Sequence, residues 1–518
     1  MREEYIYIKM KEEDNKLFVD YIDTFKLGQY NSFESLFDAL KNSKITMVYM
    51  ADTALQFSYL IEWAKDLSVK RAKNNIYTMR IKDIVFKSVD HIYNAPFECI
   101  CRDFELGEPS ARSVKKLVDY IEKLGGKFSF RKGEFLTIGA LSWLWESRGF
   151  CKPGEDILGA RYNNWFNLED YEFFKKRKIY RGGLCLINHE LAGTTVEGLY
   201  KYDKNSFYPW AMTQPLPGGP YQYYKGRSYN EHDLVHVRIS GTNKFKGLAP
   251  LSIHAFEVFD FFNEEMWLFN MELQELMNWY DMTVEYIGYC HWMWNKPDDM
   301  LTECMNFFYD KKSTTTGVEQ RGYKLIMNNC YGKWAQEPNC TANTVVENGA
   351  FVEKTVGYNP YKVRSLAVAA KIASTARTEL LRSIREATHG RPDKYFVYGD
   401  TDSMILTIPY DKVGKKLGEF KFEGMFQKGR ALSKKCYMLY DGERYECHAS
   451  GINRTALELE MNSLTWEEAE KRFDYGQTFM CPTRVKIEGG KKIVMMPRVL
   501  SKGLEASTFD NIYGVYEE

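Results

Sequence analysis

The sequence has little of what marks disordered, fibrous and membrane proteins. Only 15 of its 518 residues are proline and 37 are glycine, with no low-complexity tract and no repeat of fixed period. This excludes collagen-like, coiled-coil and disordered chains. No continuous apolar run is long enough for a signal peptide or a membrane span. We therefore expect a cytoplasmic protein with no membrane partner.

Net charge is also lacking, because 70 Lys and Arg residues balance 70 Asp and Glu residues. A histone-like coat protein is excluded, and any contact with nucleic acid must come from local clusters of basic residues. The 11 cysteines are odd in number and form no C-x-x-C pair, which favours a reduced compartment over a disulfide framework or a zinc ribbon. The eight histidines show no metal-ligand spacing.

What is present is an ordered, aromatic-rich chain long enough for several domains. Hydrophobic residues make up 44% and aromatic residues 15%, and roughly 150 residues per domain predicts three or four domains. The first 126 residues mix a strand-like run at 45–50 with a helical pattern at 55–67, and a helix at 365–387 precedes a strand at 394–400. We predict an α+β multidomain fold.

Three separated segments carry candidate chemistry. The first is KYDKNSFYPWAM at 201–212, in which Asp203 ends an apolar-flanked strand. The second is RGYKLIMNNCYGKWA at 321–335, in which Lys324, Asn328 and Tyr331 share one helix face. The third is VYGDTDS at 397–403, a predicted hairpin with Asp400 and Asp402 at its tip.

Together these residue types suit phosphoryl transfer. Carboxylates from two strands, Asp203 and Asp400, can hold two Mg²⁺ ions, and basic residues nearby can bind a triphosphate. That basic face would comprise Lys312, Arg321, Lys324 and Lys333. Taken alone, each segment has a simpler interpretation: a solvated β-turn, the polar side of a surface helix, or ordinary packing.

These segments resemble the motifs of family B DNA polymerases, specifically the protein-primed branch of small tailed phages and linear plasmids. YDKNSFYP resembles motif A with Phe207 in place of leucine, KLIMNNCYG resembles motif B with Asn329 in place of serine, and YGDTDS resembles motif C. KKCYMLY at 434–440 contains a K-x-Y motif, and IYRGG at 179–183 resembles the Y-x-G-G motif. Five motifs in order cover about 180–440.

The resemblance implies a role for each matching residue. Asp203 and Asp400 would be the metal ligands, with Asp402 supporting them, and Tyr208 would be the steric gate that rejects ribonucleotides. The residues expected to bind the nucleotide are Lys312, Arg321, Lys324, Asn328, Tyr331, Tyr208 and Ser206. Those expected to bind primer and template are Lys435, Tyr437, Tyr180, Arg181, Gly182, Gly183, Tyr398 and Thr401.

The resemblance also implies a right-hand architecture behind an N-terminal RNase H-like exonuclease-type domain. The expected parts are an exonuclease-like domain at 1–154, a first palm segment at 155–216, an insertion at 217–299, fingers at 300–335, a second insertion at 336–362, a second palm segment at 363–453 and a small β-rich thumb at 454–518.

In this branch the two insertions are terminal-protein regions, one holding the priming protein and one closing a ring around DNA. The implied partners are therefore template and primer DNA and a terminal protein, with the enzyme monomeric on DNA. The implied activity is strand-displacing synthesis from dNTPs with two Mg²⁺ ions, for which Mn²⁺ could substitute.

The N-terminal part departs from the family pattern. The first strand reads YIYIKMK where an Asp-x-Glu is expected, Asp52 and Gln56 stand at the asparagine and aspartate positions, and the helix at 113–124 keeps Asp119 but has Lys115 in place of tyrosine. One carboxylate of four cannot assemble a two-metal site, so we expect an exonuclease fold without proofreading. The alternative is that this divergent region aligns differently and that Asp20, Asp23 or Asp52 is the missing ligand.

Two other functions stay open. The same site would suit primer-independent or untemplated synthesis in a mobile element or defence system. A non-catalytic DNA-binding relic is the third possibility, although such a relic would be expected to lose Asp203, Asp400, Lys324 or Tyr208, and all four are present.

Overall fold

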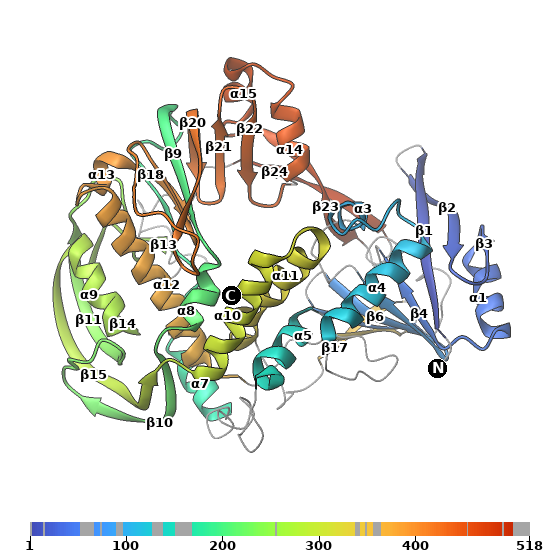
Figure 1. Cartoon of the computed structure of the whole chain (residues 1–518), viewed down its shortest axis with the longest axis horizontal. Helices are drawn as coiled ribbons and strands as arrows, with labels where there is room; N and C mark the ends of the chain where they lie inside the picture. Colours follow the sequence, from blue (N-terminus) through green and yellow to red (C-terminus); the bar gives the residue numbers. More distant parts are fainter. Residues whose placement is uncertain are drawn as a thin grey trace. The chain divides into compact units, whose positions relative to one another are not determined.

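A computed structural model of the protein describes residues 3–13, 16–51, 67–72, 75–89, 97–126, 138–150, 168–253, 256–336, 342–347, 350–355, 364–452, 454–488 and 492–500. The chain forms two compact units. The first comprises Met1–Gly149, Phe307–Val363 and Val485–Met495, and the second comprises Phe150–Asn306, Arg364–Arg484 and Met496–Glu518 (Figure 1).

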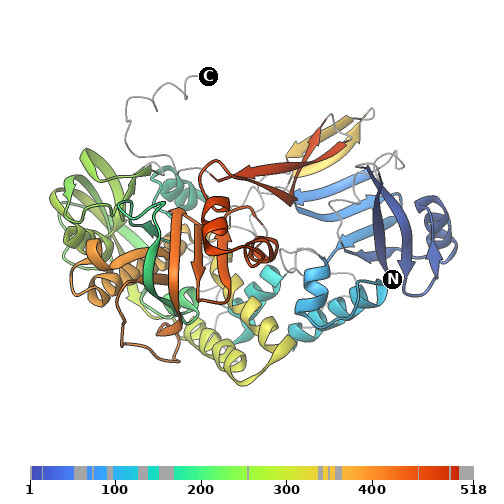
Figure 2. The ribbon, with the colours of Figure 1, turned by 90° about the horizontal axis from the view of Figure 1, so that it is seen from above.

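The first unit contains a nine-stranded sheet in the order β17-β16-β5-β6-β7-β4-β1-β2-β3. Its strands are β1 (Glu3–Glu13), β2 (Lys16–Thr24), β3 (Gln29–Tyr30), β4 (Met47–Met50), β5 (Leu67–Ala72), β6 (Asn75–Ile81), β7 (Ile84–Ser88), β16 (Ala342–Glu347) and β17 (Ala350–Thr355). The central strands β1, β4 and β7 are parallel. The second predicted insertion forms the hairpin of β16 and β17, which extends this sheet beside β5 (Figure 2).

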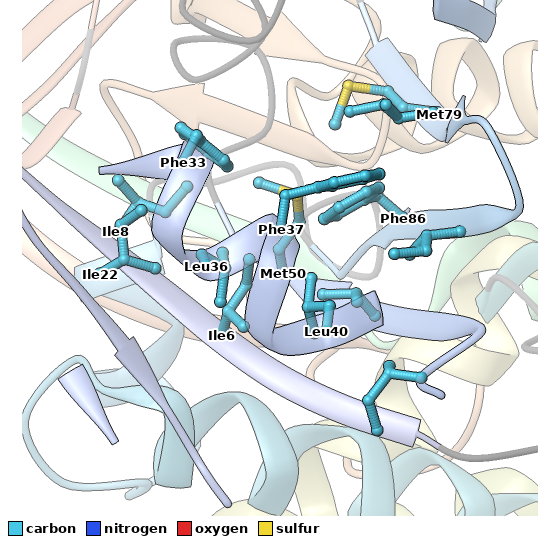
Figure 3. Packing of buried hydrophobic residues seen from close by; sticks show 14 residues of the cluster. Ile6, Ile8, Ile22, Phe33, Leu36, Phe37, Leu40, Met50, Met79 and Phe86 are labelled. Carbon is cyan, nitrogen blue, oxygen red and sulfur yellow. The ribbon is translucent and has the colours of Figure 1, made fainter. Parts of the chain in front are cut away.

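One face of this sheet is covered by α1 (Phe33–Asn42). Alternate residues of β1, Ile6 and Ile8, point toward the apolar stripe of α1, which includes Leu36 and Phe37 (Figure 3). The N-cap Ser32 fixes the start of the helix by accepting a hydrogen bond from the backbone N–H of Ser35. This core depends on apolar burial and needs no ligand.

Other helices pack on the remaining surfaces of the first unit. They are α3 (Phe97–Asp103), α4 (Ala111–Gly125), α5 (Ile138–Leu144), the π-helix η2 (Trp145–Gly149) and α11 (Gly317–Trp334). Because Tyr5 contacts Lys115 of α4 and Tyr7 packs against Phe97 of α3, these two helices cover the face of β1 opposite α1. The boundary between the units falls within α10 (Asp299–Thr314).

The second unit is built on a seven-stranded antiparallel sheet in the order β22-β21-β20-β9-β19-β18-β8. Its strands are β8 (Cys185–Ile187), β9 (Val196–Lys204), β18 (Phe396–Asp400), β19 (Ser403–Leu406), β20 (Phe420–Ser433), β21 (Cys436–Tyr440) and β22 (Tyr445–Ala449). The predicted strand before the YGDTDS turn and the predicted hairpin are both confirmed.

A long buried helix, α12 (Leu366–Ala387), organises the helical layer of the second unit, as the sequence predicts. It contacts α7 (Leu168–Lys176), α8 (Phe207–Met212) and α9 (Asn270–Trp279). Short side chains such as Ala369, Ala370 and Ala373 let these helices approach closely.

The first predicted insertion is a four-stranded antiparallel sheet in the order β10-β15-β11-β14. The strands are β10 (Leu216–Lys225), β11 (Leu234–Asn243), β14 (Asp260–Phe269) and β15 (Tyr280–Lys296), accompanied by the short pair β12 (Ser252–Ile253) and β13 (Phe256–Glu257). Helix α9 joins β14 to β15.

The C-terminal segment differs from the expected β-rich thumb in its first half. It begins with helices α14 (Arg454–Met461) and α15 (Trp466–Arg472), followed by the hairpin of β23 (Thr478–Glu488) and β24 (Lys492–Val499). Helix α15 starts at a capping box formed by Thr465 and Glu468. A short helix, α13 (Pro392–Tyr395), precedes β18.

Across the described part of the chain, no helix is both long and apolar enough to cross a membrane. The cysteines whose state the structure gives are Cys99, Cys101, Cys185, Cys290, Cys304, Cys330, Cys436 and Cys447, and all of these are free thiols.

Candidate active site

Two acidic residues lie side by side on the seven-stranded sheet because of its strand register. Asp203, near the end of β9, pairs with Ser403 at the start of β19, and Asp400, at the end of β18, pairs with the same Ser403 from the other side. Residues opposite one another on neighbouring strands point to the same face. Two strand spacings of about 4.8 Å put the two aspartates roughly 10 Å apart at their Cα atoms.

The third acidic residue, Asp402, sits in the tight turn between β18 and β19. Thr401 adopts a left-handed conformation there (φ 63°), which is strained for a β-branched residue. The turn is held by hydrogen bonds from Asp402 N to Asp400 O (2.6 Å) and from Thr401 N to Leu184 O (2.6 Å). The fold therefore imposes this geometry on the turn.

Burial and neighbouring charges perturb two of the three carboxylates. Burial raises the pKa of Asp402 to about 7, and the charges of Asp203 and Asp400 add to the rise. Burial also raises the pKa of Asp203, despite the nearby Lys421. A cluster of this kind is stabilised by bound positive charge.

Two lysines provide part of that positive charge. Lys435 Nζ lies 3.0 Å from each carboxylate oxygen of Asp400, and Lys421 Nζ lies 3.5 Å from Asp203 Oδ2. Lys435 is the lysine of the K-x-Y motif. Sequence reasoning missed Lys421, which faces Asp203 only because β20 pairs with β9, and no local signal predicts that pairing.

The donor set fits a cation that arrives with a phosphate-bearing substrate. No group of three or more His, Cys, Asp or Glu residues arranged to hold a metal ion is found in the described ranges. Mg²⁺ needs less from the protein, because it keeps waters and is usually bound by one or two carboxylates together with substrate phosphates. Asp203 and Asp400 can supply these two carboxylates.

The Tyr180–Gly183 loop lies against this site. A Cβ atom added at Gly183 would stand 2.8 Å from the hydroxyl of Tyr208 and 3.1 Å from Thr401 Cγ2, so the loop, the predicted gate tyrosine and the motif C turn are packed together. Ser206 precedes α8 in a left-handed conformation, and this sharp turn places Tyr208 in the first turn of the helix.

Two tyrosines predicted to bind primer and template DNA pack near Lys435. Tyr398 is fully buried, and its hydroxyl accepts a hydrogen bond from the backbone N–H of Lys435 at 2.8 Å. Its ring lies 5.1 Å from that of Tyr437, whose hydroxyl donates to Glu446 at 3.1 Å. In these contacts Tyr398 orients the turn that carries Lys435.

The predicted nucleotide-binding residues of motif B lie in the first unit, on α11. Lys324 and Asn328 are exposed and Tyr331 is half-buried on one side of the helix, whereas Ile326 and Met327 are buried on the other. Arg321 Nη1 lies 3.7 Å from Asp103 Oδ1, and Lys312 of α10 stacks over Tyr309 with its Nζ 5.2 Å from the ring centre. The predicted site residues thus fall into two sets, the carboxylates in one unit and the motif B residues in the other.

Helix α11 is anchored at both ends within its own unit. Near its start, Tyr120 Oη donates to Val318 O at 2.6 Å, close to Gly322, where any Cβ atom would collide with the same hydroxyl. At its end, the indole N–H of Trp334 donates to the buried carboxylate of Glu146 in η2. The N-terminal part of the chain therefore supports the motif B helix.

The predicted exonuclease positions are only partly described. Asp52 and Gln56 lie outside the described residues. Asp119 is exposed on α4 and forms an ion pair with Lys115, whose Nζ also lies 5.7 Å from the ring centre of Tyr5. Tyr5 occupies the first strand and stacks on Tyr49 at 5.3 Å.

Two of the alternative ligands can also be located. Asp20 is exposed on β2, and Asp23 Oδ2 accepts a hydrogen bond from Ala111 N (2.8 Å) at the start of α4. Asp23 therefore caps a helix, whereas the third alternative, Asp52, lies outside the described residues.

Comparison with known proteins agrees with the motifs. A family model described as DNA polymerase type B, organellar and viral, matches residues 117–362. The chain is 26% identical over 385 residues to the DNA polymerase of Bacillus phage Nf, covering 66% of this chain and 65% of that protein. It is 28% identical over 302 residues to the DNA polymerase of Bacillus phage phi29, covering 51% and 48%. These matches thus span less than two thirds of the length of these relatives.

The structure extends the likeness to nearly the whole chain. It matches phi29 DNA polymerase complexed with primer-template DNA with a TM-score of 0.75 at 17% identity, covering 96% of this chain and all of that one. The ternary complex of the same polymerase with incoming nucleotides gives a TM-score of 0.72. The predicted resemblance to phage-type family B DNA polymerases and the predicted multidomain polymerase fold are both confirmed.

Proposed function

We propose that the protein is a DNA-directed DNA polymerase of the protein-primed family B type, which copies a linear phage or mobile-element genome. The observation that carries the proposal is the placement of Asp203 and Asp400 on either side of Ser403, with Asp402 in the adjoining strained turn. Strand register brings Asp203 and Asp400 to one face of the sheet and the turn adds Asp402, a set of carboxylates that suits two-metal phosphoryl transfer.

In the proposed reaction the 3′ oxygen of the primer attacks the α-phosphorus of a dNTP, and pyrophosphate leaves. Bound Mg²⁺ ions would activate the attacking oxygen and neutralise the triphosphate. Asp203 and Asp400 would hold them, supported by Asp402. Lys435, held against Asp400, would keep the primer end near the carboxylates, and Lys421 would limit the negative charge on Asp203.

The remaining motif residues would position the substrates. Lys312, Arg321 and Lys324 offer positive charge for the triphosphate, and Asn328 and Tyr331 would line the nascent base pair. Tyr208 would lie under the sugar, and Tyr180–Gly183 would contact the template. The Nε and Nη2 atoms of Arg181 are buried, with Nη2 3.1 Å from Glu272 Oε1, so any contact of this loop with the template would come from its other residues.

Loss of proofreading is part of the proposal. Asp119 is neutralised by Lys115, and the facing position on the first strand is occupied by the stacked ring of Tyr5. An aromatic ring and an ammonium group in these places oppose the binding of two cations. The domain would then serve as a scaffold that supports α11.

Protein priming and strand displacement are proposed from the family resemblance and from the insertions. The first insertion is a complete four-stranded sheet that exposes Tyr223, Tyr229 and Trp294, which suits a protein partner such as a terminal protein. The second insertion forms the hairpin β16–β17, for which a role in strand displacement is proposed.

The test uses the full chain with Mg²⁺ and dNTPs on three templates: a primed strand, an unprimed strand, and an unprimed strand supplied with a candidate terminal protein from the same genome. We expect extension of the primed strand and terminal-protein-dependent initiation on the unprimed one. Synthesis on the unprimed strand alone would favour the primer-independent alternative, and no synthesis on any template would favour the non-catalytic relic.

A further inference from the structure

A buried carboxylate joins the first insertion to the helix beneath the active site. Glu272 lies on α9 with a side chain that is 4% exposed. It accepts hydrogen bonds from Arg377 Nε (2.8 Å), Arg377 Nη2 (2.7 Å) and Ser374 Oγ (2.7 Å), all from α12. Glu272 was not singled out in the sequence.

Arg377 connects this carboxylate to the Y-x-G-G loop. Its remaining terminal nitrogen, Nη1, donates to the backbone carbonyls of Arg181 (2.6 Å) and Gly182 (2.8 Å). The Arg181 side chain also forms an ion pair with Glu272, with its Nη2 3.1 Å from Glu272 Oε1. The planar guanidinium of Arg377 therefore fixes two successive loop carbonyls against Glu272, which the point charge of a lysine could not do.

The electrostatics show that the network stays charged. Burial opposes ionisation of Glu272, but the charges of Arg181 and Arg377 outweigh it and lower its pKa to about 2. A buried ion pair is a poor source of stability compared with apolar packing, and its best-attested use is to specify one arrangement. The arrangement specified here is that of the loop.

The loop in turn touches the predicted sugar gate. Gly183 follows Gly182 directly, and the space where its Cβ would lie is bounded by the Tyr208 hydroxyl at 2.8 Å and by Thr401 at 3.1 Å. Because the loop and Tyr208 are in contact, a shift of the loop after release from Arg377 would change the packing around Tyr208.

We propose that Glu272 and Arg377 are positioning residues that hold the Tyr180–Gly183 loop against Tyr208 and thereby set the discrimination between deoxyribonucleotides and ribonucleotides. This inference rests on the proposed polymerase function. It makes sugar selection depend on a residue of the first insertion that touches no substrate.

The chain contains a matched control. Glu275, one turn further along α9, is also buried and pairs with Arg385 of α12 at 2.7 and 3.0 Å. Glu275→Gln therefore removes a second α9–α12 ion pair of the same kind, and none of the contacts described for Glu275 or Arg385 reaches the loop. Any effect of merely loosening the α9–α12 packing should appear in both variants.

The experiment compares Glu272→Gln, Arg377→Lys and Glu275→Gln in primer extension with dCTP and CTP, measuring kcat/KM for each. We expect the ratio of the kcat/KM for dCTP to that for CTP to fall about tenfold or more in the first two variants. A misplacement of about 1 Å at a reacting site can change the rate by this much. The ratio should be unchanged in Glu275→Gln. An equal ratio in all three variants and the wild type would overturn the proposal.

A second readout separates this proposal from the proposed function. Hydrogen exchange of the loop amides needs no catalysis, and it should accelerate in Glu272→Gln but not in Glu275→Gln. If the wild type extends primers and exchange does not change in Glu272→Gln, the proposed role of Glu272 in holding the loop is wrong, whereas the proposed polymerase function is unaffected. If exchange changes but the wild type incorporates no nucleotide, the polymerase proposal fails, and sugar selection fails with it. Should Glu272→Gln fold poorly, Ser374→Ala removes one hydrogen bond of the same network and should lower the ratio by less.

Discussion

The two units differ in the surroundings of their candidate metal-binding aspartates. In the second unit, Asp203, Asp400 and Asp402 lie close together, and burial raises the pKa values of Asp402 and Asp203, with the charges of Asp203 and Asp400 adding to the rise at Asp402. In the first unit, Asp119 stands exposed beside Lys115, whose Nζ lies 5.7 Å from the ring centre of Tyr5. Under the proposed function the first of these places binds cations and the second does not.

The contrast shows that a fold and its chemistry depend on different residues. The first unit is held by an apolar core on the far side of β1, in which Ile6, Phe37 and Phe86 are buried. On the near side, the packed ring of Tyr5 needs no charge to hold the sheet, so this fold does not depend on a metal site. In the second unit, burial opposes ionisation of Asp203 and Asp402, and we infer that function retains them.

The largest effect should come from breaking the charged site. Asp400→Ala should lower nucleotide incorporation by about three orders of magnitude or more. A catalytic metal lowers the activation free energy by several kcal/mol, and this variant would lose a ligand of that metal. Primer–template binding should persist. Steady-state extension and a gel-shift assay measure the two quantities, with the exposed Asp411→Ala as the control. Normal extension by Asp400→Ala would rule out the metal assignment.

The next effect concerns specificity within the same site. Tyr208→Ala should raise the efficiency of ribonucleotide incorporation by about one to two orders of magnitude, since the ring that excludes the 2′ hydroxyl is removed. The measurement is the ratio of kcat/KM for CTP and dCTP. An unchanged ratio would make Tyr208 a packing residue only.

A smaller effect should show that the first unit acts as a scaffold. Gly322→Ala places a methyl group against Tyr120 and Leu124, which should lower stability by about 1–3 kcal/mol and weaken dNTP binding through α11. In the control, Gly332→Ala on the same helix, nothing lies within 4 Å of the new atom. Its stability should stay equal or rise. Thermal unfolding measures the stability of both variants. An equal loss of stability in both would argue that the contact between Gly322 and Tyr120 does not anchor α11.

The buried Lys371 of the second unit should make the free energy of unfolding depend on pH. Burial lowers the pKa of Lys371 on α12 to about 7, against the attraction of Glu231, Asp233 and Glu272. Between pH 7 and its ordinary value of 10.5 the unfolded chain binds one more proton, so stability should rise with pH.

The test is urea unfolding at pH 7.5 and 9. The neighbouring His232 has a lowered pKa and should be neutral throughout this range. Lys371→Met should abolish most of the rise, whereas Lys394→Met, at an exposed position of the same unit, should keep it. A rise that persists in Lys371→Met would show that other groups cause it.

The smallest effect is expected at the exposed ion pair. Asp119→Asn should change stability by no more than about 0.5 kcal/mol, as for other exposed pairs. Thermal unfolding in low and high salt is the measurement. A loss of several kcal/mol would mean that Asp119 has a buried role in the intact protein.

The sequence predicted the polymerase fold and the palm hairpin because motif and structure coincide locally. The positions of Asp400 and Asp402 at a turn, and of Lys324, Asn328 and Tyr331 on one helix face, follow from spacing alone. Lys421 and Glu272 could not be predicted in this way. Each acts through a partner far away in the chain, Asp203 for Lys421 and Arg377 for Glu272, and only strand register and helix packing bring them together.

The most direct test of the contrast between the two sites uses one labelled primer–template with Mg²⁺, incubated with and without dNTPs. We predict extension with dNTPs, lost in Asp400→Ala, and no shortening of the primer without them, in the wild type or in Asp119→Asn. Shortening by the wild type that disappears in Asp119→Asn but persists in Asp400→Ala would contradict the account, because it would show that the first unit retains a working exonuclease.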